Sequence, residues 1–169
     1  MTTWFATVPS PIGPLRLAKR GDALVELTMQ PEAHRPDGSW REEPKRLERE
    51  TTQIAEYFAG ARTRFDLPIE LEGTPFQRRV WEALTRIPFG QTVSYGALAR
   101  AVGKPGAARA VGAANSKNPI AIVVPCHRVI AADGTLCGFA SGTHRKSWLL
   151  DWERSAVSIA ALGNVVSPR

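Results

Sequence analysis

The chain of 169 residues is 43% hydrophobic and 22% charged, a composition that excludes disordered and fibrous proteins. No apolar run approaches the roughly 18 residues of a membrane-spanning helix, and no signal peptide is visible, so we expect a cytoplasmic protein without a membrane partner. Residues 1–73 carry ten Lys/Arg and twelve Asp/Glu, whereas residues 74–169 carry twelve and four, which indicates either a polyanion-binding second half or a basic solvated surface.

Residues 1–73 show the short alternating runs of a small antiparallel sheet. Helical spacing of apolar residues over 46–58 predicts one helix, with Gly60 just beyond its end. The polar stretch 31–44, which precedes this helix, is expected to be a loop. The predicted strands are 4–8, 15–18, 23–29 and 65–71. We therefore expect an N-terminal α/β subdomain over residues 1–73, with no residues that indicate chemistry.

Residues 74–169 are expected to form a mostly α-helical C-terminal domain. Thr74 followed by Pro75 is a typical helix start, and this first helix is predicted to reach about residue 86. The last helix is predicted from Lys146 to about residue 155.

The stretch 94–114 predicts a helix-turn-helix, because two short helices are separated by a Gly-containing turn at 102–106. Ser94 is the expected N-cap of the first helix. The second, over 107–114, consists of small residues around Arg109. Helices that read base edges usually display Asn, Gln, Arg or Ser, so this one is expected to approach a narrow groove without reading sequence. The alternative is a helix that packs tightly against the core.

The apolar run 120–125 predicts a buried strand that presents Cys126 beside His127 and Arg128. A thiol in such basic surroundings can act as a nucleophilic thiolate, whereas a lone cysteine in an apolar run is often inert. Successive side chains of an extended chain point to opposite faces. His127 is therefore expected to act on Cys126 through a water molecule or after a local bend.

Three further features lie near this run. Asn118 before Pro119 predicts a turn, which the Asn118 side chain can brace. Glu153 on the last helix is the candidate acid that orients His127, or else a surface carboxylate. The Gly-rich stretch 134–142 can approach a flat ligand closely, and Cys137 within it is given no role. Two cysteines and three scattered histidines indicate no metal site and no disulfide framework.

Taken in order, these motifs resemble the O6-alkylguanine-DNA alkyltransferase family, also called methylated-DNA–protein-cysteine methyltransferases. The similarity spans about residues 74–153 and is carried by Pro125-Cys-His-Arg-Val129, Ala108-Arg-Ala-Val-Gly112 and Asn118-Pro119. It implies a cofactor-free DNA repair protein that binds duplex DNA through the minor groove and flips out O6-alkylguanine, or O4-alkylthymine. The alkyl group then passes to Cys126 once per molecule. A nucleoid-associated monomer that can cluster on DNA is also implied.

The resemblance also implies roles for individual residues. Cys126 is the acceptor, His127 its base through water, Glu153 the acid that orients His127, and Asn118 the brace of the turn. Arg109 is the finger that fills the gap in the duplex, and Tyr95 turns the nucleotide and donates a hydrogen bond to the guanine ring. The other expected DNA contacts are Ser94, Ala110, Gly112, Ala113, Asn115 and Arg128, and the expected pocket residues are Val129, Phe139, Ala140 and Ser141. Some members bind zinc in the N-terminal part through Cys and His, but no cysteine precedes Cys126 here, so that zinc site is not expected.

Without the family resemblance, the residues themselves are compatible with two other functions. A lesion sensor or helix-turn-helix regulator would leave Cys126 inert. A cysteine hydrolase with a Cys-His-Glu triad would turn over repeatedly on an ester or amide.

Overall fold

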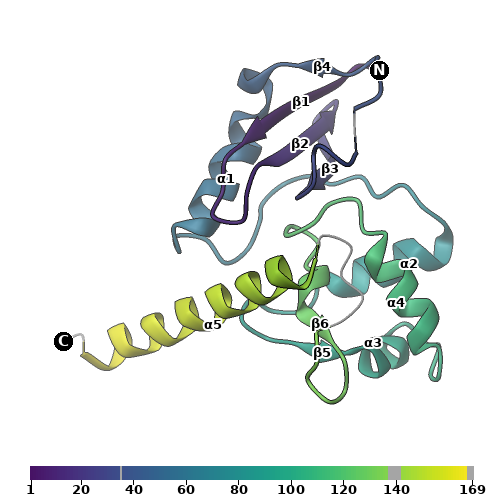
Figure 1. Cartoon of the computed structure of the whole chain (residues 1–169), viewed down its shortest axis with the longest axis vertical. Helices are drawn as coiled ribbons and strands as arrows, with labels where there is room; N and C mark the ends of the chain where they lie inside the picture. The colour runs from purple at the N-terminus through teal and green to yellow at the C-terminus, as the bar shows by residue number, and fades with distance from the viewer. Residues whose placement is uncertain (35, 137–141, 167–169) are drawn as a thin grey trace.

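The computed structural model describes residues 1–34, 36–136 and 142–166, with side chains as far as residue 160. An N-terminal sheet region stacks on a C-terminal helical region, and α5 extends outward from the body to the C-terminus (Figure 1). The elements in chain order are β1 (Thr3–Val8), β2 (Leu15–Arg20), β3 (Ala23–Thr28), β4 (Arg41–Glu42), η1 (Pro44–Leu47), α1 (Glu48–Phe58), α2 (Pro75–Leu84), β5 (Val93–Ser94), α3 (Tyr95–Ala101), α4 (Ala108–Ser116), η2 (Cys126–Arg128), β6 (Val129–Ile130) and α5 (Thr143–Val166).

The N-terminal region is a four-stranded sheet in the order β3-β2-β1-β4, packed against α1 (Figure 1). β1, β2 and β3 pair antiparallel, whereas the two-residue β4 lies parallel to β1. Leu15, Leu17 and Leu24 are fully buried between the sheet and its neighbours. The predicted small sheet with one helix is thus confirmed, although β4 falls within a stretch predicted to be a loop.

The strand predicted over 65–71 is wrong. This segment forms one isolated bridge, between Leu24 and Ile69. The Leu24 amide donates to the Pro68 carbonyl, and the Glu70 amide donates to the Leu24 carbonyl. Pro68 has no backbone N–H, which limits how far the ladder can extend.

The strand predicted over 120–125 is also wrong, although all of its residues except the half-buried Val123 are buried as expected. Ile120 bridges Leu27 at the edge of the N-terminal sheet, and Ala121 bridges Val124 across a tight turn. Ile122 within this turn has φ of 71°, which is rare for a β-branched residue. An apolar run without periodicity does not distinguish a buried strand from a buried turn.

Helix caps account for the boundaries of the C-terminal helices. Thr74 begins α2 in a capping box, since its hydroxyl accepts from the Gln77 amide at 3.1 Å and the Gln77 side chain accepts from the Thr74 amide at 3.0 Å. Ser94 caps α3 by accepting from the Ala97 amide at 3.0 Å. Trp81 on α2 donates to the Ala114 carbonyl of α4 at 2.8 Å. α3 and α4 form the predicted helix-turn-helix, and α5 is longer than the sequence indicated at both ends.

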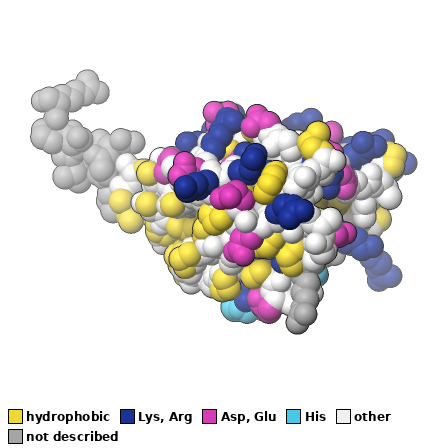
Figure 2. Space-filling model, turned by 90° about the horizontal axis from the view of Figure 1, so that it is seen from above, with side chains coloured by type: hydrophobic (Ala, Val, Ile, Leu, Met, Phe, Trp, Pro, Cys, Tyr) yellow, Lys and Arg dark blue, Asp and Glu magenta, His cyan; other side chains and the backbone are white. Residues whose placement is uncertain are grey.

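Charges of both signs are interspersed over the N-terminal face (Figure 2). In the C-terminal region, by contrast, exposed basic residues predominate on α2, α3, α4 and the adjacent turns. They are Arg78, Arg79, Arg86, Arg100, Lys104, Arg109 and Lys117. Within the described part of the chain, none of the helices has the length and apolar character needed to cross a membrane.

Replacing Thr74 with Ala removes the hydroxyl of the α2 capping box. The free energy of unfolding is expected to fall by about 1 kcal/mol, because the Gln77 amide loses its acceptor. Urea unfolding followed by tryptophan fluorescence measures the change. Thr85→Ala is the control, since the exposed Thr85 hydroxyl only donates to the Glu82 carbonyl within the same turn. Equal losses in the two variants would contradict a role for the cap.

Candidate active site and nucleic-acid interface

Cys126 begins a single turn of 3₁₀ helix, η2, and its residue is only 5% exposed. Asn115 on α4 donates from Nδ2 to the Cys126 carbonyl at 3.2 Å, and this bond fixes the position of η2 against α4. Asn118 braces the preceding segment, since its Nδ2 donates to the Val124 carbonyl at 2.7 Å and its Oδ1 accepts from the Ile120 amide at 3.0 Å. The thiol therefore lies on a locally bent, well-supported backbone.

The carboxylate of Glu153 is the hub of the polar network behind Cys126. Although Glu153 lies on α5, it is 1% exposed. Its Oε2 atom accepts from His127 Nε2 at 2.6 Å, Tyr57 Oη at 2.7 Å and Arg128 Nη2 at 3.0 Å. Its Oε1 atom accepts from Arg128 Nε at 2.8 Å and the Gly90 amide at 3.1 Å. Glu153 is thus a structural anchor, not a surface carboxylate.

This network determines which ring nitrogen of His127 acts as an acceptor. Because Nε2 faces an ionised carboxylate, Nε2 carries the proton and Nδ1 keeps a lone pair. Nδ1 is buried and has no hydrogen-bond partner among the described residues. Burial lowers the pKa of His127, against the bond with Glu153, which raises it. His127 is therefore a neutral base in the resting protein.

Glu153 stays ionised although it is buried. Burial alone would raise the pKa of Glu153, but its bonds with His127 and Arg128 hold that pKa well below its usual range. Arg128 supplies the positive charge that balances the carboxylate, and its Nη1 also donates to the Ile87 carbonyl at 2.7 Å. The Arg128–Glu153 pair is thus a neutral, hydrogen-bonded unit beneath the thiol.

The thiol of Cys126 is neutral in the resting state. Burial raises the pKa of Cys126, while a hydrogen bond from Asn118 and the positive charge of Lys146 act in the opposite direction. Lys146 on α5 is fully buried, and its Nζ lies 3.5 Å from Tyr95 Oη and 5.7 Å from the centre of the Tyr95 ring. One cation therefore favours ionisation of the thiol and polarises the Tyr95 hydroxyl.

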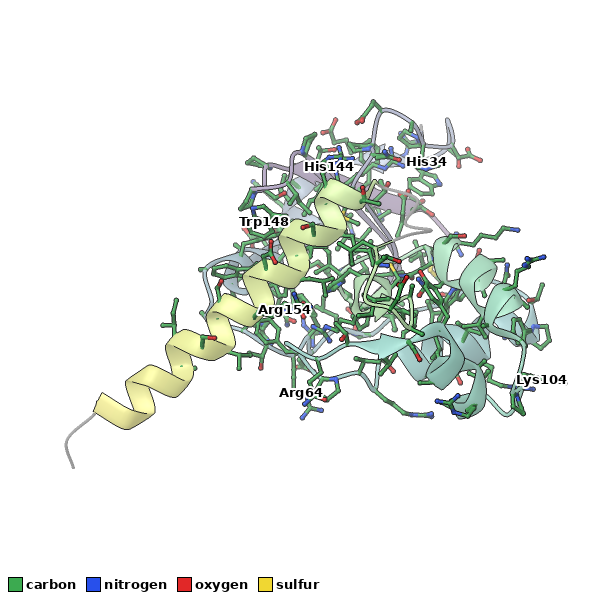
Figure 3. The ribbon with its side chains drawn as sticks, turned by 60° about the horizontal axis from the view of Figure 1, so that its bottom comes forward. His34, Arg64, Lys104, His144, Trp148 and Arg154 are labelled. Carbon is green, nitrogen blue, oxygen red and sulfur yellow. The ribbon has the colours of Figure 1, made fainter. Side chains whose placement is uncertain are left out.

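The exposed face of α4 carries small side chains and one basic side chain. Arg109, Ala110 and Ala113 are exposed, whereas Gly112 is half-buried and a Cβ there would lie 3.6 Å from the Tyr95 ring. Exposed Lys117 follows the end of the helix, and Lys104 lies at the tip of the helix-turn-helix (Figure 3). This face allows close approach to a polyanion.

Two of the DNA contacts expected from the sequence are wrong. Arg128 is 6% exposed, and its guanidinium binds Glu153 and the Ile87 carbonyl, so it is not available to a phosphate. Asn115 is 1% exposed because it faces the core side of α4, where it binds the Cys126 carbonyl. Ser94 is half-buried and its hydroxyl caps α3.

The wall of the expected alkyl pocket is described only in part. Phe139, Ala140 and Ser141 lie outside the described residues, as does Cys137. Val129 is fully buried in β6. Elsewhere, a groove of about 830 Å³ opens beside Arg128 and Phe89, but Cys126 is not among the residues that line it. In the described ranges, no three His, Cys, Asp or Glu side chains gather as around a metal ion.

Sequence reasoning missed Tyr57, Lys146 and the Gly90 amide. Lys146 had a usable signal, because it shares the apolar face of α5 with Leu149 and Glu153 at helical spacing. A lysine on an apolar helix face is seldom buried unless its charge is paired, so its position there marks a candidate site residue. Tyr57 and Gly90 had no such signal, since their contacts with Glu153 span long stretches of chain.

The site thus combines a buried thiol, an imidazole and a carboxylate beside a helix-turn-helix, and the whole chain is similar to known proteins. A family model described as "6-O-methylguanine DNA methyltransferase, DNA binding domain" matches residues 75–155, and one described as "6-O-methylguanine DNA methyltransferase, ribonuclease-like domain" matches residues 4–71. A methylated-DNA–protein-cysteine methyltransferase of Mycolicibacterium paratuberculosis is 52% identical over 151 residues, which cover 89% of this chain and 92% of that protein.

Further relatives agree with this match. A constitutive methylated-DNA–protein-cysteine methyltransferase of Bacillus subtilis is 42% identical over 160 residues, covering 89% of this chain and 95% of the relative. The crystal structure of the Mycobacterium tuberculosis O6-methylguanine methyltransferase is 49% identical with a TM-score of 0.86, over 91% of this chain and 94% of that chain. The crystal structure of the M. tuberculosis OGT in complex with DNA is 48% identical to this chain, with a TM-score of 0.85. The match covers 92% of this chain and 94% of that chain. The chain therefore belongs to the 6-O-methylguanine DNA methyltransferase family, a family of DNA repair methyltransferases.

Replacing Glu153 with Gln leaves the Arg128 cation buried without its charge partner. The free energy of unfolding at pH 7 is expected to fall by about 3–5 kcal/mol. Because the pKa of Glu153 is lowered by folding, its contribution is present above the ordinary value of 4.5 and is lost as the pH falls through the folded value. The difference between the two proteins should shrink by about 1.4 kcal/mol for each pH unit between 4.5 and the lower folded value.

Urea unfolding at a series of pH values measures this difference. The wild-type protein should also lose stability below pH 6.5, since folding lowers the pKa of His127 from 6.5 and only the unfolded chain then gains a proton. Glu82→Gln, at an exposed site on α2, is the control. A Glu153→Gln effect that is the same at all pH values would contradict the ionised state of Glu153.

Proposed function

We propose that the chain repairs DNA by transferring the alkyl group of O6-alkylguanine to its own Cys126. The observation that carries this proposal is the buried thiol beside His127, whose Nδ1 is left without a partner among the described residues while Nε2 is bound to Glu153. Such an arrangement suits a proton acceptor for Cys126 acting through water. The relatives named above as methylated-DNA–protein-cysteine methyltransferases support the same reaction.

The chemistry follows from the protonation states. Cys126 gives its proton to His127 Nδ1, and Glu153 stabilises the resulting imidazolium. The thiolate attacks the alkyl carbon, the carbon–O6 bond breaks, and its electron pair stays on the base. A proton restores guanine. The thioether on Cys126 has no leaving group, so each molecule acts once.

Tyr95 and Lys146 assist the departure of guanine. As negative charge develops on the purine, a hydrogen bond from the Tyr95 hydroxyl stabilises it. The Lys146 ammonium near Tyr95 makes that hydroxyl a stronger donor and lowers the cost of forming the thiolate. The fully buried position of Lys146 increases both effects, because the surrounding medium screens charge weakly.

DNA is proposed to bind along α3 and α4 through its minor groove. The small residues Ala110 and Ala113 allow α4 to approach the duplex, and Arg109 on the same exposed face fills the space left by the flipped nucleotide. This surface offers no set of side chains for reading base edges, so binding should depend little on sequence. The similarity to the OGT crystallised with DNA supports DNA as the partner.

The remaining features of the proposal follow the same lines. Residues 1–73 form a supporting subdomain and residues 74–169 the DNA-binding and acceptor domain. O4-alkylthymine is a second substrate, since it presents the same kind of alkyl–oxygen bond. The protein works as a monomer that can cluster along DNA, in the cytoplasm and on the nucleoid.

Incubation with an O6-methylguanine duplex, followed by digestion and peptide mass spectrometry, tests the reaction. One methyl group is expected on the Cys126 peptide, with transfer stopping at one per molecule, while the Cys137 peptide serves as an internal control. Cys126→Ala should abolish transfer but keep DNA affinity, because the 5% exposed Cys126 adds little to the binding surface. Intact binding with an unmodified wild-type peptide would instead support a lesion sensor, and repeated turnover on an ester would support a hydrolase.

Replacing Arg109 with Ala tests nucleotide flipping. Transfer from duplex DNA is expected to slow by about ten- to a hundredfold, because the gap in the stack is no longer filled. Transfer from the free base O6-benzylguanine should change little. Arg86→Ala removes one exposed positive charge from the end of α2 and is the matched control. Equal losses on duplex and free base would contradict the role of Arg109.

A further inference from the structure

The N-terminal region places one polar group inside the active-site network, the hydroxyl of Tyr57. Tyr57 lies in the last turn of α1 and is fully buried. Its hydroxyl donates to Glu153 Oε2 at 2.7 Å, the same oxygen that accepts from His127 Nε2 at 2.6 Å. A residue outside the DNA-binding region thus contacts the group that orients the base.

The position of this hydroxyl is fixed by packing. The Tyr57 ring lies 5.7 Å from the Phe65 ring and 6.0 Å, edge to face, from the Phe89 ring. Trp152, one residue before Glu153, donates from Nε1 to the Tyr57 carbonyl at 3.2 Å. One turn earlier on α5, the centre of the Trp148 ring lies 5.7 Å from the centre of the Phe58 ring. The end of α1 is therefore fixed against α5, and the Tyr57 hydroxyl is held within hydrogen-bonding distance of Glu153.

The hydroxyl also keeps its proton under all physiological conditions. Burial and then the negative charge of Glu153 raise the pKa of Tyr57 well above 10. Tyr57 is thus a permanent neutral donor to the carboxylate, whereas His127 changes its charge during the reaction. A carboxylate with one donor fewer is more basic and competes more strongly for the imidazolium proton.

We propose that Tyr57 is a positioning residue for alkyl transfer, which holds Glu153 Oε2 toward His127 and keeps the negative charge on the carboxylate. The proton taken from Cys126 then stays on His127 while the thiolate attacks. The inference rests on the proposed function, and it makes the N-terminal region a part of the reacting machinery. The simpler alternative is that Glu153 only satisfies a buried tyrosine hydroxyl, with no effect on the reaction.

The full-length Tyr57→Phe variant separates these two roles. The rate of a single round of transfer from an O6-methylguanine duplex is measured as a function of pH. The rate at neutral pH is expected to fall about tenfold, the loss of one hydrogen bond to a charged group. The fall in rate on the acid side should move to higher pH, because Glu153 and His127 bind protons more tightly without the hydroxyl. A purely structural role would lower stability and leave the pH profile unchanged.

Gln53→Ala is the matched control, since it removes buried hydrogen bonds between α1 and the Asp66 backbone without removing a hydrogen bond of Tyr57 or Glu153. Its transfer rate and pH profile should match the wild type. In a Glu153→Gln background, Tyr57→Phe should cause no further loss of rate, because the hydroxyl acts through the carboxylate.

A wild-type rate and pH profile for Tyr57→Phe, or an additive loss in the Glu153→Gln background, would overturn the inference alone. A wild-type protein that leaves Cys126 unmodified would overturn the proposed function together with it. The two failures are distinguished by the wild-type reaction, which every experiment includes.

Discussion

Removing the Glu153 carboxylate from water costs several kcal/mol unless its charge is balanced and its oxygens are bonded. The protein meets this cost with four donor residues from three segments: Arg128 and His127 in η2, the Gly90 amide after α2, and Tyr57 in α1. Each donor must be in place at once, because an unsatisfied buried charge is strongly destabilising. The carboxylate therefore fixes how α5 and the N-terminal region pack around the turn that carries the thiol.

The ion pair that stabilises the fold and the two groups proposed to exchange a proton are on different residues. Arg128 balances Glu153 permanently, so His127 is free to remain neutral and to accept a proton at Nδ1. The thiol of Cys126 is also neutral at rest, because burial outweighs the help that it receives from Lys146. At rest, neither the imidazole nor the thiol therefore carries a charge. A buried, neutral thiol is protected from other electrophiles.

The sequence predicts the features that depend on local chemistry. The start of α2 follows from the cap at Thr74, and the reactive triplet after Pro125 is visible as polar residues that end an apolar run. Features that depend on distant partners could not be predicted. The sequence does not show that Arg128 binds a carboxylate 25 residues further along the chain, or that the hydroxyl of Tyr57 contacts the same carboxylate across 96 residues. Only the folded chain shows that both serve Glu153.

We infer that Glu153 holds His127 as a neutral imidazole with its proton on Nε2, leaving Nδ1 to accept the proton of Cys126. The ¹⁵N chemical shifts of the His127 ring in the DNA-free protein measure this directly. The account predicts a neutral ring at pH 7 with Nε2 protonated, and loss of that fixed tautomer in Glu153→Gln. A ring protonated on Nδ1, or a charged imidazolium at pH 7, would contradict it.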